Sequence, residues 1–543
     1  MKALENTPTN SHLQERVYLY LLFFTALILR LAYLWDFCQT PFFENILPAF
    51  DQSNYHRQAI LFAEGDLLNS NFSKVPPLYS YFLGSLYYLF NKDLLLVRAF
   101  QLLFCGLLNT CLVFVITRNL FGFPPAIVAG SIYAFWGPSV FYEAILLRAA
   151  LTSTLLLCCL YFLLKSQENK KSYFFPFLCI LFSVFICLCR PNFIPQLFIC
   201  LFFLLRFHAY RLKVFLVFLV ILGFLFLPFC LRNYRLNKSF SPFGSQGGKV
   251  ILHSNLTTYS GYSWNPPPRY ISLEQSGFSF ALPEVVSIVL KDWWTNPHRV
   301  LPLFWKKFRS LVHNEEIPSN VNFYLSQNIM PGLRWTLAYF APLFLSFLGF
   351  TILCFILQRE KEILLLTFVL GLILSLLPFY IVSRLRLPIV PVFIIAAVGF
   401  WTHLLQNTTE FKLFTRFILI CFFVISIPFF NRPLGPKIQT ADYIRATDYL
   451  NYFYGFSAMG DVYMTDYCVL NFYKLARPTL AKNISLVFYK GIMDVHRLLQ
   501  KREFLQAKNR CVYLLLRKPE MPYYLFLLNL SVRAIKKPEK FKM

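Results

Sequence analysis

The chain has 543 residues, of which 57% are hydrophobic, 19% are aromatic and only 14% are charged. A soluble domain carries about 25% charged residues, so this composition excludes a soluble fold and predicts an all-α polytopic membrane protein. The formal net charge of +26 does not indicate a nucleic-acid partner, because much of the positive charge lies in short clusters between apolar runs, as the positive-inside rule expects. Such basic loops suit anionic membrane lipids or a phosphate-bearing lipid substrate.

Apolar runs that are long enough to cross a hydrocarbon core, about 20 residues, recur along the chain. The first run is too long for a cleaved signal peptide and lacks a small-residue cleavage site, so we interpret it as a signal anchor. The apolar stretch from Leu78 to Phe90 is short, which favours a re-entrant or juxtamembrane helix over a crossing. We predict about 11 transmembrane helices, at 17–35, 94–116, 124–142, 147–165, 173–189, 192–206, 214–231, 335–357, 363–382, 389–405 and 415–430.

Short basic loops orient these predicted helices. Three clusters fall on one side of the membrane, and the positive-inside rule makes that side cytoplasmic. The clusters are Lys165/Lys170/Lys171, Arg206/Arg211/Lys213 and Arg359/Lys361. The loops 36–93 and 232–334 then face outward and form a vestibule for the transmembrane domain, residues 1–430.

The tail, residues 431–543, has no long apolar run and is rich in aromatic residues, which predicts a soluble helical domain on the outward side. Two of its stretches, 463–478 and 504–519, share a pattern. In the second, Ala507 and Cys511 stand at offsets that resemble a tetratricopeptide repeat. A generic helical domain is the alternative.

The cysteines and histidines do not predict a metal site. The 14 cysteines lie mostly inside apolar runs, where cysteine behaves as a small hydrophobic residue. No His/Cys grouping has the spacing of a zinc site. The histidines of the outward segments, His56, His253, His298 and His313, are scattered along the chain.

Asp51 is the first candidate for chemistry. It opens an amphipathic segment, 52–64, soon after the first predicted span. Aspartate is a favoured helix N-cap, and this position precedes a predicted helix. Alternatively, a carboxylate just outside the membrane can act as a general base towards an acceptor hydroxyl or amine. The residue pattern leaves both interpretations open.

Basic residues near the predicted outer surface are candidates for phosphate binding. Lys74 precedes Pro76 and Pro77, which fix the backbone; it either presents an ammonium to a phosphate or snorkels at the interface. Arg384 and Arg386 lie in a short outward turn, where the positive-inside rule disfavours basic residues. Guanidinium groups there can clamp a phosphate or diphosphate, and anchoring the ends of the spans is the alternative.

Glu143 and Arg148 flank the short outward turn between the third and fourth predicted spans. A salt bridge between the two side chains is one interpretation. The other interpretation puts both on the wall of the outward cavity that holds Asp51.

Several of these residues belong to an ordered set of short motifs. Single pieces are weak, but the set spans roughly residues 17–430 in order. The pieces are Asp51-x-x-x-Tyr55-His56-x-x-Ala59 with Gly65-Asp66, Pro76-Pro77-Leu78-Tyr79-x-Tyr81-Phe82-Leu83-Gly84, Arg98-x-x-Gln101, Arg118-x-Leu120-Phe121-Gly122, Phe141-Tyr142-Glu143, Arg190-Pro191-Asn192, Pro228-x-x-x-Arg232-Asn233, Gln246-Gly247-Gly248, Glu316-Ile317-Pro318-Ser319-Asn320 and Arg384-x-Arg386-Leu387-Pro388. The set resembles the dolichyl-phosphate-mannose-protein mannosyltransferase-like superfamily of GT-C-type glycosyltransferases, which includes bacterial aminoarabinose transferases.

The resemblance implies inverting transfer of a sugar from a polyprenyl-phosphate donor to a lipid, glycan or protein acceptor. It implies that Asp51 deprotonates the acceptor. Many relatives have a second carboxylate next to this aspartate, whereas Gln52 stands here, and Glu143 is the candidate to supply it. The substrate-binding residues that follow are Tyr55, His56, Lys74, Arg98, Arg148, Arg384 and Arg386.

The resemblance also implies an enzyme of the bacterial inner, or cytoplasmic, membrane whose active site faces the periplasm or exterior. No acidic pair of the kind that holds a nucleotide-sugar and its metal is present, so we expect no cofactor and no required metal. Two other functions stay open: an O-antigen ligase or polymerase, and a lipid or solute transporter, although no inverted repeat is visible. A membrane scaffold for the tail is a further alternative.

Overall fold

The computed structural model describes residues 8–44, 46, 51–67, 75–238, 240–244, 246–261, 266–319, 321–405, 495, 498, 503–517 and 535. Every regular element among them is a helix, which confirms the predicted all-α class. The chain divides into two compact units. The first comprises Met1–Trp35 and Leu47–Pro436, and the second comprises Asp36–Ile46 and Lys437–Met543.

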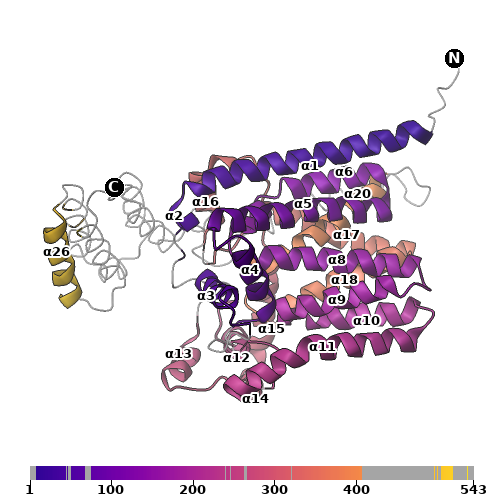
Figure 1. Cartoon of the computed structure of the whole chain (residues 1–543). Helices are drawn as coiled ribbons and strands as arrows, with labels where there is room; N and C mark the ends of the chain where they lie inside the picture. The colour runs from indigo at the N-terminus through magenta and orange to yellow at the C-terminus, as the bar shows by residue number, and fades with distance from the viewer. Residues whose placement is uncertain are drawn as a thin grey trace. The chain divides into compact units, whose positions relative to one another are not determined.

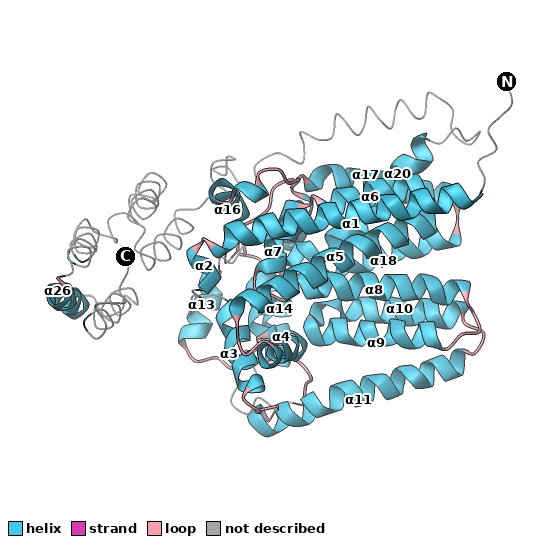
Figure 2. Cartoon of the chain, turned by 45° about the horizontal axis from the view of Figure 1, so that its top comes forward, coloured by secondary structure: helices cyan, strands magenta, loops and turns pink. Residues whose placement is uncertain are grey.

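The first unit is a bundle of long apolar helices that lie side by side (Figures 1 and 2). Within the described residues, six stretches are long and apolar enough to cross a membrane, and three shorter apolar helices accompany them. The bundle helices are α1 (Pro8–Cys38), α5 (Leu94–Phe121), α6 (Phe123–Ala134), α8 (Ala149–Glu168), α9 (Phe174–Cys189), α10 (Ile194–Phe207), α11 (Arg211–Asn237), α17 (Phe340–Leu357), α18 (Glu360–Leu376) and α20 (Val390–Leu405). A polytopic membrane protein, as predicted, is thereby confirmed.

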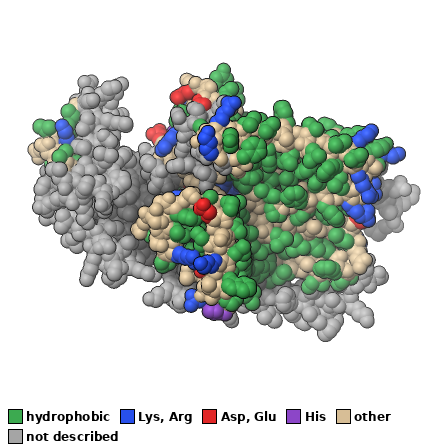
Figure 3. Space-filling view, turned by 90° about the horizontal axis from the view of Figure 1, so that it is seen from below, with side chains coloured by type: hydrophobic (Ala, Val, Ile, Leu, Met, Phe, Trp, Pro, Cys, Tyr) green, Lys and Arg blue, Asp and Glu red, His purple; other side chains and the backbone are tan. Residues whose placement is uncertain are grey.

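The bundle has a centre and a periphery. In the apolar stretch that ends with α20, 89% of the residues are buried inside the protein, whereas only 22% are buried in that of α11. Apolar side chains therefore cover much of the outer surface of the bundle (Figure 3), as expected for helices in contact with lipid. Each predicted span up to 389–405 overlaps one of the bundle helices, and 415–430 lies outside the described residues.

The predicted span 124–142 is wrong in one respect, because it is not one helix. Helix α6 ends at Ala134, and the short helix α7 (Gly137–Ala144) follows. Between them, the Phe135 carbonyl accepts a hydrogen bond from the Leu337 N–H at 2.7 Å, and the Gly137 N–H donates to the Leu337 carbonyl at 2.8 Å. These bonds to a distant segment replace helical ones, and Pro138 has no N–H to extend the earlier helix.

Short helices cluster at one end of the bundle (Figure 1). They are α3 (Asp51–Ala63), α4 (Pro77–Leu89), α12 (Gly247–Asn255), α13 (Pro268–Gln275), α14 (Leu282–Thr295), α15 (Pro297–Val312), α16 (Phe323–Ile329) and α19 (Ser383–Arg386), with 3-10 turns at Pro191–Phe193, Pro331–Leu333 and Leu387–Ile389. We call this the Asp51 end. Helix α4 has only 13 residues, so it is too short to cross, as the sequence predicts.

A buried ion pair joins the first helix to α7. Arg30 of α1 donates from Nε to a Glu143 carboxylate oxygen at 2.8 Å, and the two side chains are 0% and 1% exposed. Tyr133 donates to the other carboxylate oxygen at 3.2 Å. Gly106 of α5 leaves the room for this pair, because a Cβ at that position would lie 1.9 Å from Arg30 Nε and 2.5 Å from Glu143 Oε2. Such a pair is stable only with its hydrogen bonds complete.

In the second unit, the described helices are α2 (Pro41–Glu44) and α26 (Phe504–Arg517). Phe504, Ala507 and Cys511 of α26 are buried, and their spacing marks one face of an amphipathic helix. The stretch 463–478 lies outside the described residues. The tetratricopeptide-like interpretation of the tail therefore stays a prediction.

Candidate active site

Asp51 is the first residue of α3, which packs against α4 at one end of the bundle. One turn further along α3, Tyr55 is 3% exposed and meets the ring of Tyr79 from α4 edge to face, with ring centroids 4.9 Å apart. Ser80 of α4 donates a hydrogen bond to the Gln58 side chain of α3. These contacts fix the helix that carries Asp51.

Asp51 is paired with Arg384, which lies 333 positions later in the chain. Arg384 Nη1 donates to the Asp51 carboxylate, while Nη2 donates to the Tyr380 hydroxyl at 3.1 Å. The Arg384 side chain is 12% exposed and that of Asp51 is 40% exposed. The carboxylate is thus held by a nearly buried cation and still accessible to a molecule outside.

A second arginine, Arg190, contacts the Arg384 backbone from inside the protein. Arg190 lies between α9 and α10, is 1% exposed, and donates from Nη2 to the Arg384 carbonyl at 2.8 Å. Its Nε and Nη1 have no hydrogen-bond partner among the described residues. Arg148 lies near the same residues, with Nη1 donating to the Cys189 carbonyl at 3.1 Å. We call the site formed by Asp51, Arg384, Arg190 and Arg148 the Asp51 corner. Burial, and after it the positive charge of Arg148, lowers the pKa of the Arg190 guanidinium, although arginine stays protonated at neutral pH.

The corner therefore concentrates positive charge around the accessible carboxylate. Burial raises the pKa of Tyr55, whose electrostatic neighbours include Arg148, Asp51 and Arg190, so its hydroxyl stays protonated and can donate a hydrogen bond. Unsatisfied buried N–H groups are costly, and like charges repel in a low dielectric. An oxyanion that accepts from these groups would relieve both penalties.

Arg386 does not share this corner with Arg384. Its Nη2 lies 2.7 Å from a Glu316 carboxylate oxygen, and the two side chains are 2% and 3% exposed. Arg386 also donates to the carbonyls of Leu311 and His313. The predicted clamp of two neighbouring arginines is therefore divided: one faces Asp51, and the other fixes the 311–316 segment.

Glu143 and Arg148 do not form the salt bridge that one interpretation predicted. Glu143 is paired with Arg30 instead. Arg98 donates to the Ala144 carbonyl at 2.9 Å, and Gln101 donates to the Glu143 carbonyl at 2.7 Å. Glu143 and Arg98 thus hold α7 in place from inside the bundle.

His56 and Lys74 complete the predicted set. His56 Nδ1 lies 2.6 Å from the Tyr87 hydroxyl, and burial lowers the pKa of this imidazole, with the charge of Arg98 as the second cause. His56 is therefore neutral at physiological pH. Lys74 lies outside the described residues, so its role stays a prediction.

Sequence reasoning quoted Arg190 within a motif but did not select it as a site residue. The available signal was the one that singled out Arg384: a basic residue in a short outward connection between two apolar runs, against the positive-inside rule. Arg30 was missed as the partner of Glu143, because 113 positions separate them and no local pattern links such residues.

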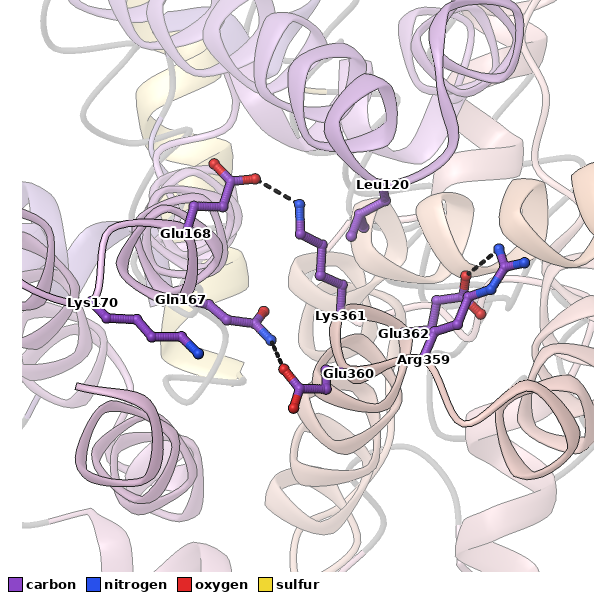
Figure 4. A pocket seen from close by; sticks show the side chains of 8 residues that line it. All are labelled: Leu120, Gln167, Glu168, Lys170, Arg359, Glu360, Lys361 and Glu362. Atoms are coloured by element: carbon purple, nitrogen blue, oxygen red, sulfur yellow. Dashed lines mark hydrogen bonds and ion pairs between the residues drawn. The ribbon is translucent and has the colours of Figure 1, made fainter. Parts of the chain in front are cut away.

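A different charged region occupies the other end of the bundle (Figure 4). Glu168 at the end of α8 pairs with Lys165 at 2.8 Å and with Lys361 at 2.7 Å. Helix α8 starts beside Arg148 and has 20 residues, so this region lies about 30 Å from the Asp51 corner. It borders a cavity of about 340 Å³, lined by Leu120, Gln167, Glu168, Lys170, Arg359, Glu360, Lys361 and Glu362.

Residues 74–231 match the model of a family described as dolichyl-phosphate-mannose-protein mannosyltransferase. The match confirms the family resemblance predicted from the sequence. The matched segment contains Arg148 and Arg190, whereas Asp51 and Arg384 lie outside it. No curated protein matches the sequence.

Among solved structures, the chain is similar to the oligosaccharyltransferase of Archaeoglobus fulgidus in the apo form, with 14% identity, coverage of 79% of this chain and 57% of that chain, and a TM-score of 0.42. For the same archaeon's AglB in complex with an inhibitory peptide and a dolichol-phosphate, the values are 13%, 83%, 59% and 0.40. For ArnT from Cupriavidus metallidurans bound to undecaprenyl phosphate, they are 13%, 91%, 73% and 0.36. The chain spans less than two thirds of the length of the archaeal enzymes.

Proposed function

We propose that this protein is a membrane glycosyltransferase that takes a sugar from a polyprenyl-phosphate donor and transfers it, with inversion, to a lipid, glycan or protein acceptor. One observation carries the proposal. The accessible Asp51 carboxylate is paired with Arg384, beside the buried Arg190, whose Nε and Nη1 have no hydrogen-bond partner among the described residues. A base and an oxyanion site next to each other are what this reaction needs.

The arginines are the proposed phosphate site. Arg384, Arg190 and Arg148 supply charge-assisted N–H donors, and guanidinium groups bind phosphate in a bidentate manner. Lys74, in the same outward loop as Asp51, is proposed to add an ammonium. These groups offset the negative charge that develops on the leaving phosphate, so the proposal requires no metal.

In the proposed transfer step, one bond forms and one bond breaks at the anomeric carbon of the donor sugar. Asp51 accepts the proton of the acceptor hydroxyl or amine, and the freed lone pair attacks the anomeric carbon of the donor sugar. The bond between that carbon and the phosphate oxygen breaks, and its electron pair leaves with the phosphate, which the arginines hold. The new bond forms on the opposite face of the sugar, which inverts its configuration.

Arg384 links the two halves of the site. Its N–H groups donate to Asp51 and Tyr380, and an ion pair of this kind makes a carboxylate a weaker base. A donor phosphate competes for the same N–H groups. We propose that donor binding draws Arg384 away from Asp51 and so activates the base only when a sugar is present.

The active site is proposed to face away from the cytoplasm. Lys361 reaches both Glu168 and Asn119, and the Ala209 N–H donates to the Lys170 carbonyl, so the basic clusters of the sequence meet at one end of the bundle. Figure 3 shows Lys and Arg side chains at that end. The positive-inside rule then makes it cytoplasmic and the Asp51 end extracytoplasmic.

Replacing Asp51 with Asn tests the proposal. Asparagine retains the size of the side chain and cannot accept the proton, and loss of a general base typically costs about 100- to 10,000-fold in rate. The readout is the release of undecaprenyl phosphate from a panel of undecaprenyl-phosphate sugars in membranes that contain the natural acceptors, because this product is the same for every sugar.

The control is binding of undecaprenyl phosphate to the purified variant in detergent. We expect Asp51→Asn to insert in the membrane, keep the melting temperature of the parent and bind the lipid phosphate at least as tightly, because Arg384 loses a competing anion. Wild-type release of undecaprenyl phosphate by the variant would refute Asp51 as the base.

A further inference from the structure

Helix α15 packs one face against the protein and has large apolar side chains on its exposed face as well. Leu303, Lys307 and Leu311 are buried against the protein. On the other side, Leu301 is 79% exposed and Trp305 is 50% exposed, one turn apart, and the neighbouring Lys306 is exposed as well. Exposed leucine and tryptophan side chains next to each other on a helix form an apolar patch, and such patches mark contacts with protein or membrane.

The contacts of α15 place it at the level where two membrane spans end. The ring of Phe308 packs on Phe344, the fifth residue of α17, with centroids 5.7 Å apart. Lys307 donates to the carbonyl of Leu377, which directly follows α18, at 3.2 Å. Trp305 stacks on Phe308 at 5.7 Å. The exposed face of α15 therefore continues into the surface of the apolar bundle.

Exposed aromatic side chains also stand near the ends of spans at the Asp51 end. Trp335 is 81% exposed and Tyr339 is 65% exposed, just before α17 begins at Phe340. Trp35, near the end of α1, is 72% exposed. Tryptophan and tyrosine are enriched where spans meet the membrane–water interface.

We propose that α15 is an interfacial helix, with Leu301 and Trp305 inserted at the boundary between lipid headgroups and acyl chains and Lys306 directed to the headgroup phosphates. The partner is the lipid bilayer at the Asp51 end. Exposed Leu and Trp beside Lys on one helix is the composition of such helices, and continuity with the spans through Phe308 and Phe344 provides the location.

This placement has a consequence for the active site. The residues that follow α15 hold the turn that carries both arginines, because Arg386 donates to the carbonyls of Leu311 and His313 and lies two positions after Arg384. A helix embedded at headgroup depth thus sets the depth of Arg384.

The test is the depth of a nitroxide label on Leu301→Cys, in the full-length protein reconstituted in phosphatidylcholine–phosphatidylglycerol vesicles. Relaxation by oxygen, which partitions into lipid, is compared with relaxation by a water-soluble nickel chelate. Gln275→Cys is the matched control, because Gln275 is exposed on α13. The labelled parent corrects for its own cysteines, which are buried or partly buried in the described residues.

We expect the ratio of oxygen to nickel relaxation to be several-fold higher at Leu301 than at Gln275. Equal ratios would show that α15 faces water, and protection from both reagents would show that protein covers it; either result overturns the proposal. A second measurement avoids a new cysteine: Trp305→Phe should remove part of the fluorescence that brominated phosphatidylcholine quenches, and an unchanged quenched fraction would also contradict the proposal.

Discussion

Charged side chains lie at both ends of the bundle, but the pairing of these charges differs between the two ends. At the end of the bundle that holds Lys361, each carboxylate of the cavity in Figure 4 has a partner: Glu168 pairs with two lysines, Glu362 with Arg359 and His403, and Glu360 accepts from Gln167. At the Asp51 end, Arg190 is buried with two N–H groups unsatisfied. Compensated charges hold helices together, whereas an uncompensated buried cation indicates a ligand.

Arg386 is a buried, compensated cation at the Asp51 end, and its loss should have the largest effect on stability. Arg386→Met leaves the Glu316 carboxylate buried without its cation, which typically costs about 3–5 kcal/mol. We expect a clearly lower melting temperature in detergent and a lower yield of folded protein. Arg386→Met combined with Glu316→Gln should recover part of the loss; no recovery would mean that the ion pair is not the reason.

Arg190 should respond in the opposite way. Arg190→Met removes charge-assisted contacts to a phosphate, worth about 1.5–3 kcal/mol in total, so the affinity for undecaprenyl phosphate should fall by about 10- to 150-fold. The melting temperature should change little, because the bond to the Arg384 carbonyl is lost while an unfavourable burial of charge is removed. A variant that melts early and binds normally would make Arg190 a structural residue like Arg386.

The buried Lys307 should make the stability of the protein depend on pH. It is fully buried, its Nζ donates to Asn255 at 2.8 Å, and burial lowers its pKa from 10.5 to about 7. Between these values the unfolded chain binds more protons than the folded one, so stability rises with pH by up to about 1.4 kcal/mol per unit. The measurement is the melting temperature from pH 6.5 to 9.5, and Lys307→Met should flatten this rise; an equal slope in the variant would assign it to other groups.

Lys361 should show the smallest effect. Its side chain is 39% exposed and that of Glu168 is 26% exposed, and pairs of this kind contribute about 0–1 kcal/mol. Lys361→Ala should therefore shift the melting temperature slightly and leave undecaprenyl phosphate binding unchanged. Loss of lipid-phosphate binding in this variant would mean that the cavity of Figure 4, rather than the Asp51 corner, holds the ligand.

The bundle was predictable from sequence because hydrophobicity is a local property. Each apolar run near 20 residues has one solution in lipid, a helix, and the runs 94–116 and 147–165 coincide with α5 and α8. The break after Ala134 was not predictable, because hydrogen bonds to Leu337, about 200 positions away, decide it.

The candidate site was predictable as a set of unusual residues and not as an arrangement. Asp51 and Arg384 are charged residues close to apolar runs, where such residues are rare, so the sequence alone marks each of them. Their pairing, and the separation of Arg384 from Arg386, depends on which way each side chain turns at the end of a span. Arg384 is directed by its hydrogen bond to Tyr380, and Arg386 by its ion pair with Glu316. Residue spacing along the chain does not reveal such tertiary contacts.

The ion pair between Arg30 and Glu143 limits how this chain can vary. Loss of Arg30 alone leaves a buried carboxylate without its cation, and loss of Glu143 alone leaves a buried guanidinium without its anion. Any side chain at Gly106 enters the space that the pair occupies. Three positions on three helices are therefore tied to one another, and an evolutionary path that changes one of them has to pass through changes in the others.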